Sequence, residues 1–124
     1  MDGRLRVLLI EDNDVFREAL ELLLGLEDGM EVVGSLADGS EAVGVCVRFS
    51  TDVVVLDYRL PGLDGVQLTR AIKYACPDVA VICLSASANS REIGALTQAG
   101  VAAHITKDSA FDQIVAGIRS AAGR

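Results

Sequence analysis

The chain has 124 residues, about half of them apolar, and a formal net charge of −7 at pH 7. This length predicts one domain, residues 1–124, with a single core and no room for a second domain. The acidic balance disfavours direct nucleic-acid binding by this domain and disfavours an anionic membrane surface, because both would require a basic face. Acids gathered at one place could nevertheless hold a cation.

The three cysteines, Cys46, Cys76 and Cys83, are an odd number without Cys-x-x-Cys spacing. Neither a disulfide framework nor a zinc site fits that pattern, and Cys46 and Cys83 stand in apolar stretches typical of buried thiols. We therefore expect a reducing, cytoplasmic compartment. Residues 1–4 lead directly into a short apolar run that ends in acids, which predicts neither a signal peptide nor a membrane span.

Hydrophobic patterns along the chain predict alternating strands and helices. Five β–α units with right-handed crossovers predict an α/β fold, a doubly wound (βα)5 sandwich of three layers with a parallel sheet in its middle. The chain is too short for an eight-stranded barrel, and we expect the sheet order 2-1-3-4-5. In chain order the predicted elements are strand Leu5–Ile10, helix Asp14 to about Leu26, strand Glu31–Leu36, helix Ser40 to about Arg48, strand Asp52–Leu56, helix Asp64–Ala75, strand Val79–Leu84, helix Asn89–Ala99, strand Ala102–Ile105 and helix Ser109 to about Ala121.

Boundary signals support several of these helices. Asp64 is expected to cap the third helix, which should end before Pro77, and Gly100 is expected to close the fourth. The first helix is so rich in leucine that its leucines cannot all face the sheet. Some are expected to meet a partner, although a few exposed leucines are also ordinary. The leucines concerned are Leu20, Leu22, Leu23, Leu24 and Leu26.

Asp57 is the most informative residue of the sequence. It follows four aliphatic residues, Val53–Leu56, which predict a strand buried on both faces. In open parallel sheets, ligands bind beyond the carboxyl ends of the strands, which is where Asp57 stands. Asp52 begins the same strand, roughly 16 Å away at ~3.3 Å per residue, and is expected to face solvent at the opposite pole.

Polar side chains follow the other strands at the same predicted edge. Glu11 and Asp12 follow the first strand, which neighbours the third in the order 2-1-3-4-5, so both should converge on Asp57. Three neighbouring carboxylates repel one another, and a hard divalent cation, Mg²⁺ or Mn²⁺, would relieve that repulsion. Ser85 after the fourth strand and Lys107 after the fifth would approach from the other side.

A metal, a lysine, a hydroxyl and a carboxylate nucleophile together favour phosphoryl transfer, which depends on charge neutralisation and positioning. Each residue alone also has an ordinary structural interpretation. Asp12 or Asp14 could cap the first helix, Ser85 or Ser87 could cap the fourth, and Lys107 could be a solvated surface lysine. Their joint placement at one sheet edge favours the functional interpretation.

Several motifs at particular spacings connect the chain to a known family. They are Glu11-Asp12 after Val7–Ile10, then Val54–Asp57, Leu60–Gly65, Leu84–Ala86, and Ala99–Ala102 followed by Lys107. With these motifs the chain resembles, over essentially its whole length, the response-regulator receiver domain of two-component systems, which has the CheY-like, flavodoxin-like fold. Lys107-Asp108-Ser109 is similar to the NarL/FixJ-type subfamily, whose members usually continue into a helix-turn-helix DNA-binding domain.

The resemblance implies a metal-dependent phosphoacceptor. Asp57 would accept a phosphoryl group from the phosphohistidine of a histidine kinase, or from a small donor such as acetyl phosphate. Asp12, Asp57 and the backbone carbonyl of Arg59 would ligate Mg²⁺, and Glu11 would act partly through a metal-bound water. The domain would be a regulatory protein and not an enzyme, since it would assist only its own phosphoryl transfer and dephosphorylation.

The resemblance also implies a way to read the phosphoryl group. Ser85 would donate a hydrogen bond to one phosphoryl oxygen, and Lys107 would pair with another. Ser85 and Lys107 would move toward the phosphoryl group, and their movement would shift the populations of the conformations of the face formed by the fourth helix, fifth strand and fifth helix. That face would control an effector domain, expected to be a DNA-binding helix-turn-helix in the full-length protein, or would mediate a homodimer.

Two residues depart from the family pattern. Many receivers have a proline with a cis peptide bond after the lysine, but here Asp108 follows Lys107, so that bond should be trans. His104 stands three residues before the lysine, where the family usually has Tyr or Phe as a rotameric switch. It could simply fill the space of the aromatic ring, or its protonation near neutral pH could bias the switch.

Other functions fit these residues less well. A pseudo-receiver, a binding module of the same fold that is never phosphorylated, is the main alternative, and the intact acidic pair, Asp57, Ser85 and Lys107 argue against it. A haloacid-dehalogenase-type phosphohydrolase requires Asp-x-Asp, but Arg59 stands two residues after Asp57. A flavin module would need hydroxyls and glycines where Glu11–Asp14 stand, and the sequence contains no Gly-Lys-Ser or Gly-Lys-Thr of a P-loop.

Overall fold

Aliphatic runs form five parallel strands in the computed structural model, which describes residues 3–123. Their hydrogen-bonded order is β2-β1-β3-β4-β5, which confirms the predicted order. The prediction for the N-terminus includes Met1 and Asp2, which lie outside the described residues. The strands are β1 (Leu5–Ile10), β2 (Met30–Leu36), β3 (Val53–Asp57), β4 (Ala80–Ser85) and β5 (Ala103–Thr106).

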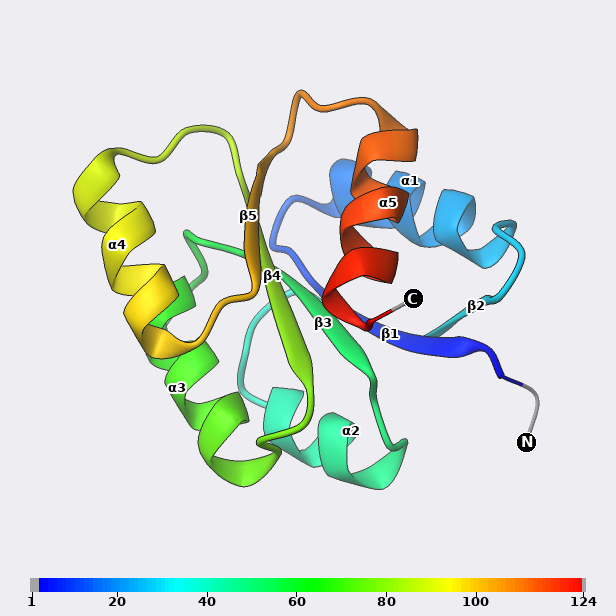
Figure 1. The fold of residues 1–124 in the computed structure, drawn as a ribbon, viewed down its shortest axis with the longest axis horizontal. Coiled ribbons are helices and arrows are strands. Elements are labelled where there is room, and N and C mark those ends of the chain that lie inside the picture. Colours follow the sequence, from blue (N-terminus) through cyan, green and yellow to red (C-terminus); the bar gives the residue numbers. More distant parts are fainter. Residues whose placement is uncertain (1–2, 124) are drawn as a thin grey trace.

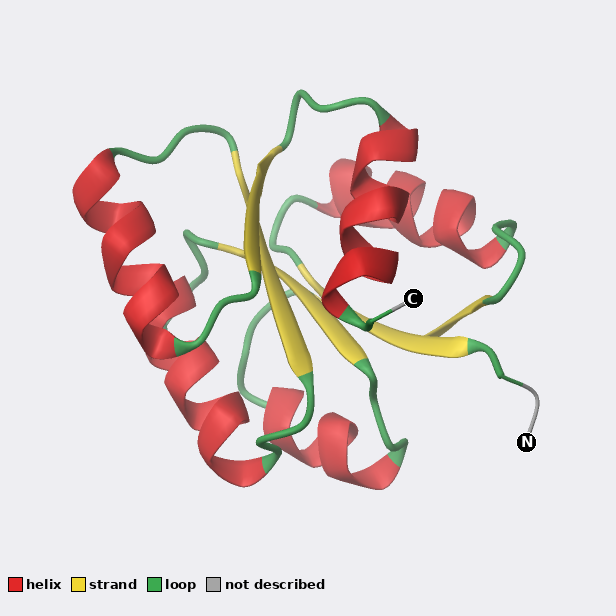
Figure 2. Cartoon of the chain, viewed as in Figure 1, coloured by secondary structure: helices red, strands yellow, loops and turns green. Residues whose placement is uncertain are grey.

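A helix follows each strand, and each of the first four helices returns the chain to the start of the next strand (Figure 1). Helices α1 and α5 cover one face of the sheet, and α2, α3 and α4 cover the other, so the predicted three layers are confirmed (Figure 2). No helix within residues 3–123 is long and apolar enough to cross a membrane. The helices are α1 (Asp14–Gly25), α2 (Ala42–Arg48), α3 (Gly65–Ala75), α4 (Ser90–Ala99) and α5 (Phe111–Ala121).

The central strand β3 is buried along its whole length and divides the core in two. Successive side chains of a strand point to opposite faces of the sheet. Val55 accordingly packs in a cluster with Leu24 of α1 and Ile118 of α5, whereas Val54 packs in a second cluster with Ile72 of α3. Both clusters support the strand that ends in Asp57, so the position of this carboxylate is fixed from both sides.

Two predicted helix starts are wrong, and local hydrogen bonds explain why. Helix α2 begins at Ala42 and not at Ser40, because Asp38 Oδ1 accepts hydrogen bonds from the N–H (2.9 Å) and the hydroxyl (2.6 Å) of Ser40 and holds it in a turn. Helix α5 begins at Phe111 and not at Ser109, because the Ser109 N–H donates to the carbonyl of Thr106 (3.1 Å). The other predicted element ends lie within one residue of those observed.

The predicted boundaries of α3 and α4 are supported by their caps. Asp64 caps α3 by accepting the N–H of Gln67 (2.9 Å). Gly100 closes α4 in a left-handed conformation with φ of 112°, which favours glycine there.

The leucines of α1, together with its C-cap residue Leu26, divide between core and surface. Leu20 and Leu24 are buried, whereas Leu22 is 65%, Leu23 44% and Leu26 75% exposed. The prediction that these leucines cannot all face the sheet is therefore confirmed, and whether the exposed ones meet a partner stays a prediction.

The cysteines should differ sharply in reactivity. Burial is the main reason that the pKa of the Cys46 thiol is raised to about 11 and that of the Cys83 thiol to about 12, whereas Cys76 is only half-buried. Since the thiolate is the reactive form, we expect only Cys76 to react readily with a disulfide reagent near pH 8 in the native protein, and all three thiols to react in denaturant. Thiol titration with and without denaturant measures this, and rapid native labelling of Cys83 would contradict it.

Candidate functional site

Four strand ends deliver polar side chains to one edge of the sheet. Glu11 follows β1 directly, Asp57 ends β3, Ser85 ends β4 and Lys107 follows β5 directly. Because the strands are parallel, their carboxyl ends open onto one crevice. The backbone N–H of Lys107 also donates to the carbonyl of Ser85 (2.9 Å), and this bond joins the ends of β4 and β5.

Glu11, Asp12 and Asp57 form a cluster of carboxylates. One oxygen from each residue lies within 4.8 Å of the oxygens from the other two, so the predicted convergence is confirmed. Glu11 and Asp57 are only 5% and 7% exposed, whereas Asp12 is exposed, so the cluster has a buried floor and an open side. A set of hard oxygen donors beside solvent fits Mg²⁺, which binds through a few carboxylates and retains several waters.

Lys107 neutralises part of this negative charge. Its Nζ forms an ion pair with Glu11 Oε1, lies 3.1 Å from Asp57 Oδ2, and lies 5.0 Å from the centroid of the Phe16 ring. Burial alone would lower the pKa of Lys107, but the hydrogen bonds to Glu11 and Asp57 outweigh it and the pKa is raised. Lys107 therefore stays protonated and bridges the two buried carboxylates, unlike a solvated surface lysine.

Burial and charge repulsion in the cluster raise the pKa of Glu11. Its pKa is raised above the usual value mainly because the carboxylate is buried, and repulsion by Asp57 adds to the rise. The hydrogen bonds from Lys107 and from the N–H of Asn13 (3.0 Å) act in the opposite direction and do not cancel it. A cation beside the open side of the cluster would favour the ionised form of Glu11.

Ser85 and His104, the two predicted switch residues, are in direct contact. Ser85 is 2% exposed, and its hydroxyl oxygen lies 2.7 Å from Nε2 of His104. His104 stands opposite Cys83 in the β4–β5 register, on the face of the sheet that α2, α3 and α4 cover. No cis peptide bond occurs within residues 3–123, so the predicted trans bond between Lys107 and Asp108 is confirmed.

The loop after Asp57 is held against the start of α3. The Arg59 N–H donates to Asp57 Oδ1 (3.3 Å), and the Gly65 N–H donates to the Tyr58 carbonyl (2.7 Å). A Cβ atom at position 65 would lie 3.0 Å from Tyr58 Cα, so any larger residue would have to displace the loop. This loop carries the Arg59 carbonyl, the predicted metal ligand, while the Arg59 guanidinium extends to Glu92 of α4 (3.7 Å).

The helix-cap interpretation of the site residues is wrong. Asn13 caps α1 by accepting the N–H of Phe16 (2.9 Å), and Asn89 caps α4 by accepting the N–H of Glu92 (2.8 Å). The residues that do not cap these helices are Asp12, Asp14, Ser85 and Ser87. Of these, Asp12 and Ser85 are therefore available to the site.

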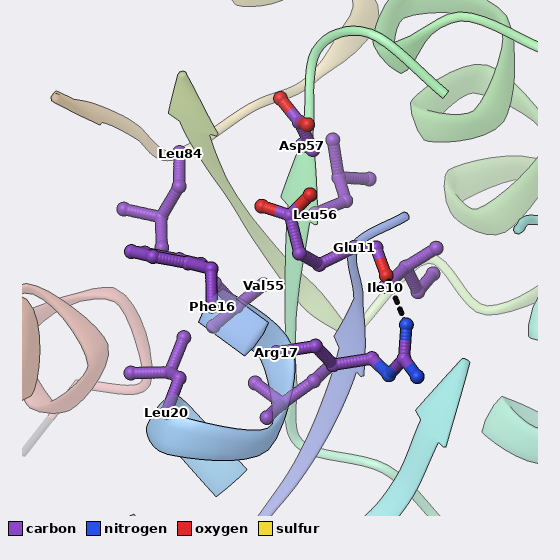
Figure 3. A pocket seen from close by; sticks show the side chains of 10 residues that line it. Ile10, Glu11, Phe16, Arg17, Leu20, Val55, Leu56, Asp57 and Leu84 are labelled. Carbon is purple, nitrogen blue, oxygen red and sulfur yellow. Dashed lines mark hydrogen bonds between the residues drawn. The ribbon is translucent and has the colours of Figure 1, made fainter. Parts of the chain in front are cut away.

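Two residues of α1 that sequence analysis missed lie beneath the site (Figure 3). Phe16 supports Lys107, and Arg17 Nη1 donates to the backbone carbonyl of Glu11 (2.7 Å). Together with Glu11 and Asp57 they line a small cavity of about 10 Å³. Side chains in the first turn of a helix point back toward its N-terminus, and that rule could have placed Phe16 and Arg17 near the acidic pair.

Asp52 provides a contrast to Asp57. It immediately precedes β3, at the end opposite Asp57, and accepts the N–H of Arg6 (2.8 Å). It is not part of the acidic cluster. The predicted separation of the two acids to opposite poles of one strand is therefore confirmed.

Comparisons with known proteins agree with this geometry. The sequence matches the family described as "Response regulator receiver domain" over residues 7–119. Response regulator UvrY of Escherichia coli (strain K12) is 33% identical over 116 residues, and the match covers 94% of this chain and 53% of UvrY. The nitrate/nitrite response regulator protein homolog of Haemophilus influenzae is 30% identical over 119 residues, and the match covers 96% of this chain and 57% of that protein. The chain thus spans about half the length of these curated relatives.

Solved structures share the fold over the whole domain. The signal receiver domain of the response regulator NarL from Mycobacterium tuberculosis matches with a TM-score of 0.92 and 31% identity over 98% of both chains. The response regulator domain of Thermotoga maritima CheB matches with a TM-score of 0.84 and 28% identity, again over 98% of both chains. Because the family match extends over residues 7–119, this chain belongs to the response regulator receiver domains, the phosphoacceptor modules of two-component systems.

Proposed function

We propose that Asp57 accepts a phosphoryl group from the phosphohistidine of a histidine kinase, in a step that depends on Mg²⁺. The observation that carries this proposal is the Lys107 bridge between Glu11 and Asp57, beside the third carboxylate of Asp12. A structural ion pair needs one acid for one lysine. Three acids around one lysine leave excess negative charge in a partly buried place, which is unfavourable unless another cation also binds there.

The metal ligands in this proposal come from two strand ends and one loop. Asp12, Asp57 and the backbone carbonyl of Arg59 would hold Mg²⁺ or Mn²⁺, and Glu11 would bind it partly through a water. When bound, the ion supplies positive charge to the carboxylates and to the oxygens of the transferring phosphoryl group. The exposed carboxylate of Asp12 is supporting evidence, because it leaves the cluster accessible from solvent.

The protein's own residues would guide the transfer. A bond forms between an Asp57 carboxylate oxygen and phosphorus while the bond from phosphorus to the donor nitrogen breaks. Lys107 would exchange Asp57 for a phosphoryl oxygen and keep Glu11 as its second partner. The Ser85 hydroxyl would donate to another phosphoryl oxygen. The domain assists its own phosphorylation and dephosphorylation in this way and turns over no separate substrate.

We further propose that the Ser85–His104 contact is the switch. A serine hydroxyl has one hydrogen, so Ser85 cannot donate to Nε2 of His104 and to a phosphoryl oxygen at once. If Nε2 of His104 accepts the serine hydrogen, phosphorylation would therefore break the bond between Ser85 and His104. His104 would then be released to move with β5. A protonated imidazole would donate to Ser85 instead and leave the serine hydrogen free, so pH would bias the switch, whereas an imidazole that only fills space would not.

For the full-length protein, we propose that the face formed by α4, β5 and α5 controls a DNA-binding helix-turn-helix domain or forms a homodimer. The support is that the relatives are response regulators about twice as long as this chain. Such a protein would regulate transcription in the cytoplasm, in keeping with the three free cysteines. The acidic receiver itself, with a net charge of −7, would leave nucleic-acid contacts to the other domain.

Incubation of the chain with acetyl phosphate and Mg²⁺ tests the proposed function. We expect intact mass spectrometry to show the addition of one phosphoryl group, and we expect a chelator of Mg²⁺ to prevent it. An unchanged mass in a chain that remains folded and has Mg²⁺ present would instead favour the pseudo-receiver, the alternative that the family match and the complete set of acids do not favour.

A further inference from the structure

We infer that Arg17 is a positioning residue for the metal site, because it fixes the peptide plane between Glu11 and Asp12. This inference rests on the proposed function, since it concerns the affinity of the acidic cluster for Mg²⁺. Arg17 lies in the first turn of α1, six residues after Glu11, and touches neither carboxylate of the acidic pair. It acts on the backbone between them.

The contacts of Arg17 are short and directed. Nη1 donates to the backbone carbonyl of Glu11 (2.7 Å), and Nη2 lies 2.8 Å from Oδ1 of Asp14. The Arg17 side chain is only 14% exposed, whereas that of Asp14 is 72% exposed. Figure 3 shows the guanidinium reaching from α1 to the backbone of Glu11, beneath the carboxylates. Asp14 therefore holds one nitrogen of the guanidinium, Nη2, while the other, Nη1, is buried against the backbone of Glu11 just after β1.

The carbonyl of Glu11 matters because the peptide bond is planar. Its oxygen, the N–H of Asp12 and both flanking Cα atoms lie in one plane, so a bond to that oxygen sets the direction in which the chain enters Asp12. Glu11 is held at every other point, since its N–H donates to the Leu36 carbonyl (2.9 Å) and its carboxylate bonds to Lys107. The bond from Arg17 to the Glu11 carbonyl is the remaining contact that holds Glu11, on the side that faces Asp12.

Asp12 has no comparable support of its own. Within residues 3–123 no hydrogen bond or ion pair reaches its carboxylate, which is exposed. Its place within 4.8 Å of the oxygens of Glu11 and Asp57 therefore depends on the backbone that carries it. Rotation of the Glu11–Asp12 peptide would move the Asp12 carboxylate away from the other two and reduce the number of ligands that one ion can reach.

A simple helix-stabilising role does not explain Arg17. The N-terminal turn of a helix carries partial positive charge, so a cation there is disfavoured and an acid such as Asp14 is favoured. An arginine that served only Asp14 could also remain in solvent, where such pairs contribute little. Burial of the guanidinium against the Glu11 carbonyl instead fits a group that holds the backbone of a metal ligand in place. Loss of groups that hydrogen-bond to metal ligands typically costs about 10–100-fold in metal affinity.

The test compares Arg17→Met and Arg17→Lys with the wild-type chain, using Mg²⁺ as the ligand and isothermal titration calorimetry or amide NMR shifts as the readout. We expect Arg17→Met to raise the Mg²⁺ dissociation constant about tenfold, at the low end of the range for groups that support metal ligands. Arg17→Lys should recover part of the affinity, because an ammonium group can still donate to the carbonyl. Saturating Mg²⁺ should restore the rate of phosphorylation by acetyl phosphate in both variants.

Arg119 provides a matched control. It binds a backbone carbonyl, that of Asp28 (2.9 Å), and a carboxylate, that of Glu27 (3.2 Å), but it lies on α5 away from the site. Arg119→Met should leave the Mg²⁺ dissociation constant unchanged even if it lowers the unfolding midpoint. Asp14→Asn, which removes only the brace of Arg17, should weaken Mg²⁺ binding by less than Arg17→Met, and it keeps the test valid if Arg17→Met does not fold.

The outcomes separate this inference from the proposed function. If the wild-type chain binds no Mg²⁺ and gains no phosphoryl group, the proposed function fails. If the wild-type chain does both, and Arg17→Met, Arg17→Lys and Asp14→Asn bind Mg²⁺ as tightly as Arg119→Met, the inference about Arg17 is overturned alone. A phosphorylation rate in the folded Arg17→Met variant that stays low at saturating Mg²⁺ would also overturn it, because positioning of a metal ligand predicts recovery.

Discussion

Asp57→Asn is expected to abolish phosphorylation of the chain by acetyl phosphate. The amide keeps the size of the side chain and can still accept the Arg59 N–H that now bonds to Asp57 Oδ1, so the fold should persist. It removes the nucleophilic carboxylate oxygen and one of the two partners of Lys107. Intact mass spectrometry should therefore show no added phosphoryl group in the presence of Mg²⁺, under conditions in which the wild-type chain is modified.

Asp52→Asn is the matched control for that experiment. Asp52 and Asp57 flank the same strand, and both accept a backbone N–H, but Asp52 lies at the pole away from the acidic cluster. The Asp52→Asn variant should be phosphorylated like the wild-type chain. Phosphorylation that persists in Asp57→Asn, or that disappears in Asp52→Asn, would mean that the acceptor is another residue.

Lys107→Met is expected to destabilise the metal-free chain near neutral pH. The substitution leaves the carboxylates of Glu11 and Asp57 buried without their shared cation. Removing one partner of a fully buried pair costs roughly 3–5 kcal/mol, and because the Lys107 side chain is 20% exposed we expect about 2 kcal/mol. Urea denaturation in the absence of Mg²⁺ measures the loss, and Mg²⁺ should recover part of it by supplying positive charge.

The loss should shrink as the pH falls. The pKa of Glu11 is raised in the folded wild-type chain, chiefly by burial, so its favourable contribution to stability is present at low pH and lost as the pH rises through that pKa. Removing Lys107 raises the pKa of Glu11 further, because the lysine lowers it. The loss of unfolding free energy caused by Lys107→Met should therefore be larger at about pH 7.5 than at about pH 5.

Lys73, the other lysine of the chain, is the control for this pH dependence. Its Nζ donates to the carbonyls of Pro77 (2.7 Å) and Val79 (2.8 Å) and pairs with no carboxylate of residues 3–123. Lys73→Met should cost stability by a similar amount at both pH values. Equal pH dependence of the two variants would show that Lys107 does not act through Glu11 and Asp57.

The sequence predicts the fold and most of the site because both depend on patterns that repeat. Buried strands are built on continuous aliphatic runs such as Val53–Leu56, and the polar residue that ends each run is placed at the sheet edge by the parallel topology alone. The convergence of Glu11, Asp12, Asp57 and Lys107 follows from strand order and needs no side-chain detail.

The remaining features depend on local contacts that have no sequence period. The turn in which Asp38 holds Ser40 shortens α2. The link between Ser85 and His104 is a single hydrogen bond of the serine hydroxyl, which no sequence pattern predicts. Arg17 resembles any helical arginine in the sequence, and only its direction toward the N-terminus of α1 and its burial distinguish it. Asn13 caps α1 although acids stand on both sides of it, because its backbone is extended and its side chain accepts the N–H of Phe16.

The phosphorylation-controlled switch is tested most directly by the amide NMR spectrum of the chain with Mg²⁺, before and after the addition of beryllofluoride as a mimic of the phosphoryl group. We expect shifts at the residues that end β1, β3, β4 and β5, continuing through Ser85 and His104 into α4 and α5, while Asp52 and its neighbours stay unchanged. The same addition should leave the spectrum of Asp57→Asn unaltered. A wild-type spectrum that does not respond, or that responds at Asp57 without any change at Ser85, His104 and Lys107, would contradict the claim that these residues form one phosphorylation-controlled switch.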